Sequence, residues 1–126
     1  MRKLILILIL AIISSNALAQ TRQVGNTTVT VLPNGVNVLR RHNPDNGRVI
    51  YELHTTTHGL RVFEAFCSRN YGHLDTFHYF DNNGSLIRKE LDTTGNGEID
   101  LIIHLVNNGQ NIARIWRDER VHGPQR

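Results

Sequence analysis

The sequence predicts an all-β protein, an antiparallel meander of about eight strands built from hairpin repeats of about 25 residues. Leaving Gly95 aside, glycine recurs at steps of 12 to 14 residues from Gly35 to Gly123. Five of these glycines directly follow Asn, and Asn-Gly is favoured in tight hairpin turns because both residues tolerate a positive φ. The segments between the turns have strand length and are rich in β-branched and aromatic residues.

The N-terminus has the three regions of a secretory signal. A short basic start, Met1-Arg2-Lys3, is followed by the aliphatic run 4–13 and by a polar stretch that ends in small residues at Ala17 and Ala19. The ten apolar residues span only about half of a ~30 Å hydrocarbon core, so a membrane anchor is the weaker reading. We therefore expect residues 1–19 to be a cleaved signal peptide and the protein to be periplasmic or secreted, with no membrane span after cleavage.

Residues 20–126 are expected to form a single all-β repeat domain, with residues 119–126 as a frayed tail. They carry twelve Lys and Arg against eleven Asp and Glu, a net charge of +1. The high overall pI is therefore no sign of a nucleic-acid partner, and none is expected. The single cysteine, Cys67, cannot form an internal disulfide, so packing and sheet hydrogen bonds must hold the domain.

Strands are expected between the turns, most clearly at residues 27–31, 49–53, 76–80 and 101–106. Two turn types alternate: tight turns at Gly35, Gly59, Gly84 and Gly109, and longer loops at Gly47, Gly72 and Gly97. The repeat is visible when residues 68–75 are laid over residues 93–100, 25 positions further on.

The alternation along residues 98–106 leaves a second face that is half apolar, which favours a sheet with both faces partly covered. A sheet rolled into a small barrel, or one that is strongly twisted, would provide that cover and would protect its edges. A single flat sheet that forms a dimer is the alternative.

The loop at residues 92–100 resembles the first nine positions of an EF-hand calcium loop, in which oxygen ligands alternate around a glycine. The candidate calcium ligands are Asp92, Thr94, Asn96, Glu98 and Asp100. However, the bidentate acid is replaced by Ile103, and strands rather than helices are expected on both sides. The alternative is a turn sequence selected for its backbone geometry. No other cofactor is expected.

Seven histidines raise the question of a metal site. On one strand His54 and His58 would lie about 13 Å apart, too far to share an ion, whereas His78 and His104 could approach each other across strands. Cys67 is read as a small apolar residue, because the sequence shows no base and orienting group around it. The chain is therefore not expected to be an enzyme.

The aromatic side chains are expected in the core: Tyr51, Phe63, Phe66, Phe77, Tyr79, Phe80 and Trp116. If some of them were exposed on one face beside arginines, they would instead form a protein- or glycan-binding surface. The arginines in question are Arg61, Arg88, Arg114 and Arg117.

The run Asp81-Asn82-Asn83-Gly84-Ser85-Leu86, followed by Asp92-Thr93-Thr94-Gly95-Asn96-Gly97-Glu98-Ile99-Asp100, resembles the Asn-Gly β-hairpin repeats of bacterial secreted and surface proteins. The rhythm is similar to that of tyrosine–aspartate and membrane-occupation-nexus repeats, mainly over residues 59–118. The resemblance implies an extracytoplasmic β scaffold and identifies no catalytic residue.

These observations lead to three functional hypotheses. The first is an exported, non-enzymatic binding module that contacts a protein or cell-envelope partner through a sheet face or its long hairpin loops. The second is a calcium-stabilised surface repeat protein that uses the 92–100 loop. The third is a periplasmic inhibitor of a lytic enzyme. A dimer is compatible with each of them.

Overall fold

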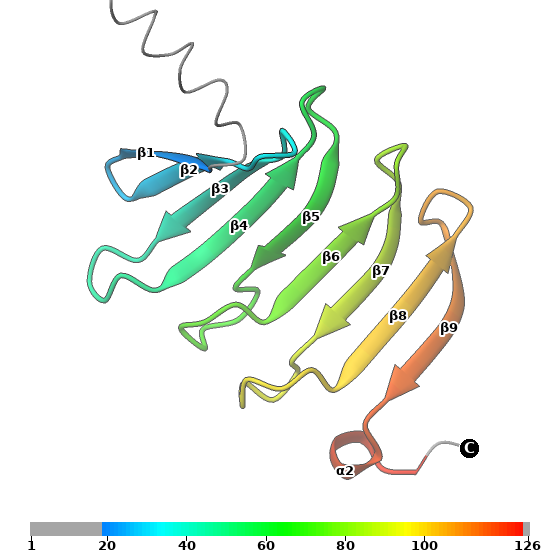
Figure 1. The fold of residues 1–126 in the computed structure, drawn as a ribbon. Helices are drawn as coiled ribbons and strands as arrows, with labels where there is room; N and C mark the ends of the chain where they lie inside the picture. The colour runs from blue at the N-terminus through cyan, green and yellow to red at the C-terminus, as the bar shows by residue number, and fades with distance from the viewer. Residues whose placement is uncertain (1–18, 125–126) are drawn as a thin grey trace, which may run out of the picture.

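The computed structural model describes residues 19–124, so the predicted signal peptide lies outside the described residues except for Ala19. Nine strands and one short helix follow along the chain (Figure 1): β1 (Gln20–Val24), β2 (Thr27–Val31), β3 (Asn37–His42), β4 (Val49–Thr55), β5 (Arg61–Phe66), β6 (Thr76–Phe80), β7 (Leu86–Leu91), β8 (Leu101–Val106), β9 (Asn111–Arg117) and α2 (Glu119–His122).

The strands form one antiparallel sheet in which every strand pairs with its neighbours in the chain, in the order β1 to β9. This arrangement confirms the predicted all-β meander. The strand that the sequence did not indicate is β1, whose residues are mostly polar and which reaches β2 through a turn at Gly25, where φ is +62°. This polar edge strand lacks the alternation of apolar and polar residues that indicates the other strands in the sequence.

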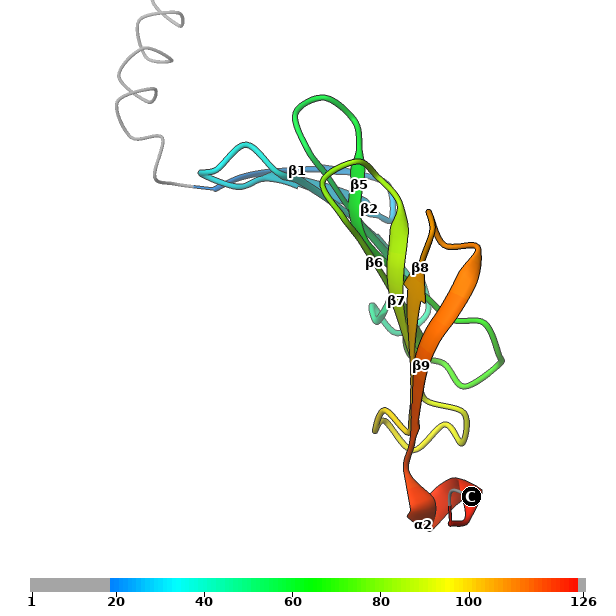
Figure 2. The same ribbon diagram turned by 90° about the vertical axis from the view of Figure 1, so that its right-hand side faces the viewer.

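The sheet is strongly twisted and does not close into a barrel; β1 and β9 are its two edges (Figure 2). Both edge strands carry arginines and no acid, Arg22 on β1 and Arg114 and Arg117 on β9. A closed seam between them would bring like charges together, and charged residues are a common means of keeping sheet edges from pairing.

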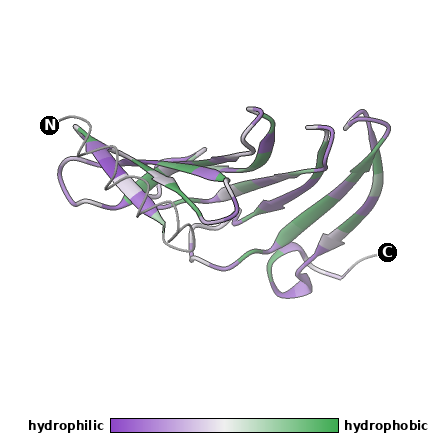
Figure 3. Ribbon diagram, turned by 45° about the horizontal axis from the view of Figure 1, so that its top comes forward, coloured by the Kyte–Doolittle hydropathy of each residue, from purple (hydrophilic) through white to green (hydrophobic). Residues whose placement is uncertain are grey.

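The sheet forms a single layer in Figure 2, and among the described residues no second layer lies over either face. Among the described residues the buried apolar side chains are only Val38, Ala65 and Phe80. Of the aromatic residues predicted for the core, only Phe80 is buried, and Trp116 is 44% exposed. Figure 3 shows the hydrophobic colour concentrated in β8, next to polar colour in the turns and in β1. The half-apolar second face predicted from residues 98–106 is present, but no second layer covers it.

Tight turns and longer loops alternate as predicted. The tight turns lie at one end of the strands and the longer loops, at residues 43–48, 67–75 and 92–100, at the other (Figure 1). Three β-bulges recur at the same place in successive hairpins, directly after His54, Tyr79 and His104. These three residues are 25 positions apart, so the repeat has a structural counterpart in the strands as well as in the turns.

The segment predicted to be frayed carries α2. The side chain of Asp118 accepts a hydrogen bond from Arg120 N and so caps this helix, and His122 Nε2 lies 3.0 Å from Asp100 Oδ1 in the preceding loop. Within residues 19–124, no helix has the length and apolar character needed to cross a membrane.

Candidate functional site

Three acidic side chains of the longer loops, Asp75, Asp92 and Asp100, are buried and accept hydrogen bonds. Asp75 is 1% exposed, and its carboxylate accepts hydrogen bonds from Ser68 N (2.9 Å), Arg69 N (3.1 Å), Ser68 Oγ (2.6 Å) and Thr76 Oγ1 (2.7 Å). Burial alone would raise the pKa of Asp75, but these hydrogen bonds lower it overall. Asp75 therefore holds the 67–75 loop by binding N–H groups that would otherwise lack a partner.

Asp92 performs the same task in the next loop. Its carboxylate accepts hydrogen bonds from Thr94 N (3.2 Å), Gly95 N (2.8 Å) and Gly97 N (2.8 Å). His73 Nε2, from the preceding loop, lies 3.2 Å from Asp92 Oδ2 and links the two loops. Asp92 is thus a turn-stabilising acid in a site built from backbone donors.

The five predicted calcium ligands lie in one loop, where Glu98 is exposed and the side chains of the other four make hydrogen bonds within the protein. Asp100 accepts from Thr93 N and Thr93 Oγ1 and faces His122, Asn96 Oδ1 accepts from Glu98 N at 3.0 Å, and Thr94 Oγ1 bonds to Asp92. A calcium ion bound by Asp92 and Asp100 would have to displace these donors. Across the described residues, no three His, Cys, Asp or Glu side chains form a group that could hold a metal ion. Calcium binding stays a prediction, to be tested by titrating calcium against Tm.

The hydrogen bonds to Asp92 have a consequence for stability at low pH. Burial opposes the shift, but the N–H of Gly97, the His73 ring and the N–H groups of Gly95 and Thr94 lower the pKa of Asp92 from 3.8 to about 2. A depressed folded-state pKa means that this carboxylate stabilises the fold above about pH 4 and loses that contribution as the pH falls toward about 2. Urea midpoints of the wild type and of Asp92→Asn, measured from about pH 6 to about pH 2, are therefore expected to converge on acidification. A difference between the two urea midpoints that stays constant over the whole pH range would contradict this stabilising role of the Asp92 carboxylate.

The cysteine and the histidines do not form the pairs that the sequence allowed. Cys67 Sγ donates to His73 O at 2.9 Å, and burial together with the charge of Asp75 raises the pKa of its thiol. His78 and His104 lie on opposite faces of the sheet, with β7 between their strands, because His78 pairs with Lys89 whereas His104 pairs with Arg88.

One face of the sheet carries a continuous row of flat side chains that crosses six strands, β4 to β9. The strand registers place these six side chains side by side, one from each strand. We call this row the ladder and its side of the sheet the ladder face; the ladder consists of His54, Phe63, Tyr79, Arg88, His104 and Arg114.

Neighbouring members of the ladder contact each other in four of the five pairs; the fifth pair, Arg88 and His104, is joined by strand register. The ring of Phe63 lies 4.9 Å from the His54 ring and 5.1 Å from the Tyr79 ring, both edge to face. Arg88 Cζ lies 4.2 Å from the centre of the Tyr79 ring, and Arg114 Nη2 lies 3.4 Å from His104 Nε2. Cross-strand pairs of this kind stabilise a sheet, which matters here because no second layer does so.

Two acids on the ladder face are paired with members of the ladder. Glu52 lies 2.9 Å from Arg40 Nε and 2.6 Å from His54 Nε2, and Glu90 Oε2 lies 3.1 Å from Arg88 Nε. The Arg88 Nε group is buried and points out of line for a hydrogen bond to Glu90, so its N–H lacks a hydrogen-bond acceptor. Burial and the charge of Glu90 raise the pKa of Tyr79, which keeps its hydroxyl neutral.

A hollow of about 470 Å³ lies beside the ladder. It is lined by the ladder members Tyr79, Arg88 and His104 and by the inserted residues of two bulges, Ile87 and Ala113. The side chain of Ile87 is 40% exposed. The repeated bulges thus give the ladder face an apolar hollow with cationic side chains along it.

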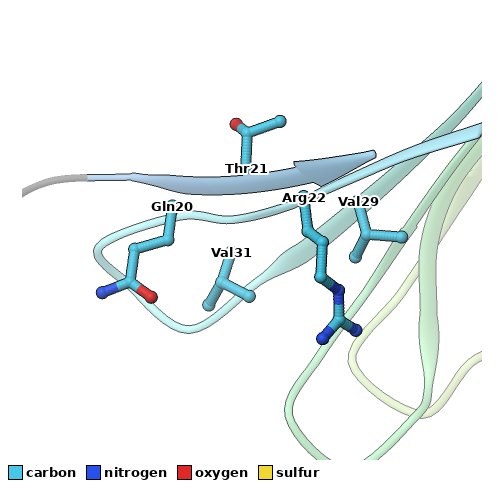
Figure 4. Close-up of a pocket in the computed structure, with 5 residues that line it drawn as sticks. All are labelled: Gln20, Thr21, Arg22, Val29 and Val31. Carbon is cyan, nitrogen blue, oxygen red and sulfur yellow. The ribbon is translucent and has the colours of Figure 1, made fainter. Parts of the chain in front are cut away.

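A second hollow, of about 410 Å³, lies at the opposite edge of the sheet between β1 and β2. The close-up in Figure 4 shows Arg22, Val29, Val31 and Gln20 pointing to one side of these strands and Thr21 to the other. It is lined by these five side chains, which include no aromatic ring and no ion pair. The ladder face is therefore the stronger candidate site.

The aromatic side chains grouped together in the sequence are divided between the two faces. Tyr51 and Phe66 lie on the face opposite the ladder, where Tyr51 Oη donates to Glu64 at 2.7 Å, and Arg61 stacks on Phe80. Phe63 and Tyr79 lie on the ladder face with Arg88. The signal that could have identified the ladder is the spacing of 25 residues that separates His54, Tyr79 and His104.

The fold and this site define an all-β, single-sheet repeat protein with a ladder of aromatic, imidazole and guanidinium side chains on one face. Compared with known protein families, the chain matches no family model, and it matches no curated protein.

Proposed function

We propose that this protein is an exported, non-enzymatic binding module that contacts a partner of the cell envelope through the ladder face. The observation that supports this function is the ladder itself, a row of six side chains that includes a tyrosine and two arginines, types enriched at binding hot spots, on a face that no second layer of the described residues covers.

The long loops are the weaker choice for the binding surface. Their acids Asp75, Asp92 and Asp100 are buried and accept hydrogen bonds from within the molecule. On the ladder face, by contrast, the exposed Arg114 is in no ion pair among the described residues. A charged group that has no internal acid partner is available to an anionic group of a ligand.

Binding to the envelope is expected to depend on Arg114 and not on Arg117. Both arginines are exposed on β9, but Arg114 belongs to the ladder and Arg117 lies on the opposite face. The protein, purified after export from cells that express the full chain, is mixed with washed envelopes and sedimented. Arg114→Glu is expected to weaken co-sedimentation by at least about tenfold, because it reverses the charge at the end of the ladder.

Arg117→Glu is the matched control, with the same change of net charge on the same strand. It should co-sediment like the wild type. Equal losses in both variants would indicate attraction between overall charges, and a wild type that stays in the supernatant would rule out an envelope partner.

A further inference from the structure

We infer that the ligand of the ladder face is a linear, anionic polysaccharide whose chain runs across the strands, along the ladder. This inference rests on the proposed binding function and specifies the chemical class of its ligand.

The flat side chains of the ladder suit sugar rings. A pyranose ring presents an apolar face of C–H groups, which packs against aromatic and imidazole rings, and a rim of hydroxyls that requires hydrogen-bond partners. The ladder offers the rings of Phe63, Tyr79 and His104 in one row, and the carboxylates of Glu52 and Glu90 lie on the same face beside them. Such a row accommodates a chain of rings better than it does a single compact ligand.

The spacing of the ladder suits a β-1,4-linked chain. Neighbouring strands lie about 4.8 Å apart, so equivalent positions of successive hairpins, such as Tyr79 and His104, recur at about 10 Å. This distance is close to the length of a β-1,4-linked disaccharide, so every second sugar would meet an equivalent ladder position. An extended peptide places same-face side chains only about 7 Å apart and would lose register after one hairpin.

The charge of the ladder at its β9 end indicates acidic sugars. Arg88, His104 and Arg114 lie together there, and the one acid among their neighbours, Glu90, is already paired with Arg88. The exposed Arg114 has no acid partner among the described residues. A carboxylate group on the polysaccharide would give Arg114 the acid partner that it lacks.

The hollow beside the ladder adds room for a substituent. Its apolar lining at Ile87 and Ala113 lies next to Arg88 and His104, so it can take the apolar part of a side group whose charge faces the arginines. Strand β9 also places Trp116, the sole tryptophan of the chain, on the ladder face opposite Ile102. The fluorescence of Trp116 can therefore report whether a ligand occupies the ladder face.

The test uses polysaccharides that separate backbone from charge. Carboxymethylcellulose is a β-1,4-linked anionic chain, hydroxyethylcellulose is a neutral chain with the same backbone, and dextran sulfate is anionic with a different linkage. Affinity electrophoresis and Trp116 emission are expected to show binding to carboxymethylcellulose at least about tenfold stronger than to either of the other two polymers. Equal binding to dextran sulfate would overturn the inference in favour of simple charge attraction, and equal binding to hydroxyethylcellulose would overturn the role of the arginines.

Chain length gives a second, independent measurement. With β-1,4-linked mannuronate oligomers, affinity is expected to rise from the disaccharide to the hexasaccharide and then to level off, because three hairpins carry the ladder. An affinity that does not change with length would contradict binding along the ladder.

Arg114→Gln is expected to weaken binding to carboxymethylcellulose by about tenfold and Arg117→Gln to leave it unchanged. Tyr79→Ala tests the stacking contact, and Tyr79→Phe keeps the ring as its folding control. If the protein sediments with envelopes through Arg114 yet binds none of the polysaccharides, the glycan inference is wrong while the proposed function stands. If the protein binds neither the envelopes nor the polysaccharides, both the glycan inference and the proposed function are wrong.

Discussion

An Asp75→Ala variant is expected to lose roughly 3 kcal/mol of unfolding free energy, the largest effect of any single side-chain truncation in the loops. The carboxylate of Asp75 is 1% exposed and accepts from the backbone N–H groups of Ser68 and Arg69 and from the hydroxyls of Ser68 and Thr76. Its removal leaves these four donors without their acceptor. A domain with so few buried apolar side chains has little else to offset the loss.

Urea denaturation followed by far-ultraviolet circular dichroism measures this effect. Asp45→Ala is the matched control, because Asp45 lies exposed in the longer loop at residues 43–48 and its carboxylate makes no hydrogen bond within residues 19–124. The free energy of unfolding of this variant is expected to stay within about 0.5 kcal/mol of the wild-type value. If Asp75→Ala were as mild as Asp45→Ala, the hydrogen bonds of this acid would not be what holds the loop.

Replacing Gly95 by alanine is expected to destabilise the protein much more than the same change at Gly97. Both glycines have a positive φ, +81° and +88°, which costs an L-residue about 1–2 kcal/mol. A Cβ at Gly97 would meet open space, whereas a Cβ at Gly95 would lie 2.6 Å from Cδ1 of Tyr71. Displacing that ring adds roughly 1–3 kcal/mol, because Tyr71 also donates a hydrogen bond to Thr93 O.

The comparison of Gly95→Ala with Gly97→Ala isolates the contact between two successive loops. Thermal unfolding of both variants is measured in the wild-type background and again in a Tyr71→Ala background. The difference in Tm between the two glycine variants should become smaller when the tyrosine ring has been removed. A gap that persists without Tyr71 would place its origin in the backbone of the 92–100 loop and not in the loop-to-loop contact.

The turns and the strand rhythm could be predicted because their causes are local. Asn-Gly pairs such as Asn83-Gly84 favour turns, and all the predicted turn glycines adopt a positive φ, Gly84 at +82° among them. Of the Asn residues that precede them, only Asn108 does so. Strand β1 escaped prediction because its polar residues show neither alternation nor aromatic content. The helix α2 escaped because four residues form a helix here only with the cap of Asp118 and the contact of His122 to another loop.

The ladder could be predicted only in part. The 25-residue spacing of His54, Tyr79 and His104 is visible in the sequence, but spacing does not reveal which strand neighbours join them. Phe63 and Arg88 enter the row through the strand register, which the bulges shift by one residue in each hairpin. A one-residue shift moves a side chain to the other face, so the face of an aromatic residue near a bulge follows from pairing alone.

The sequence by itself determined the all-β class, the meander order and the two alternating turns, since each follows from the conformational preference of a few adjacent residues. Only the tertiary structure decided that the sheet stays open as one uncovered layer, because closure depends on twist summed over nine strands and on the charges that meet at its edges. Tertiary structure also decided the use of the acids: Asp92 and Asp100 alternate with oxygen donors as calcium ligands do, yet in the folded loops N–H groups occupy their carboxylates.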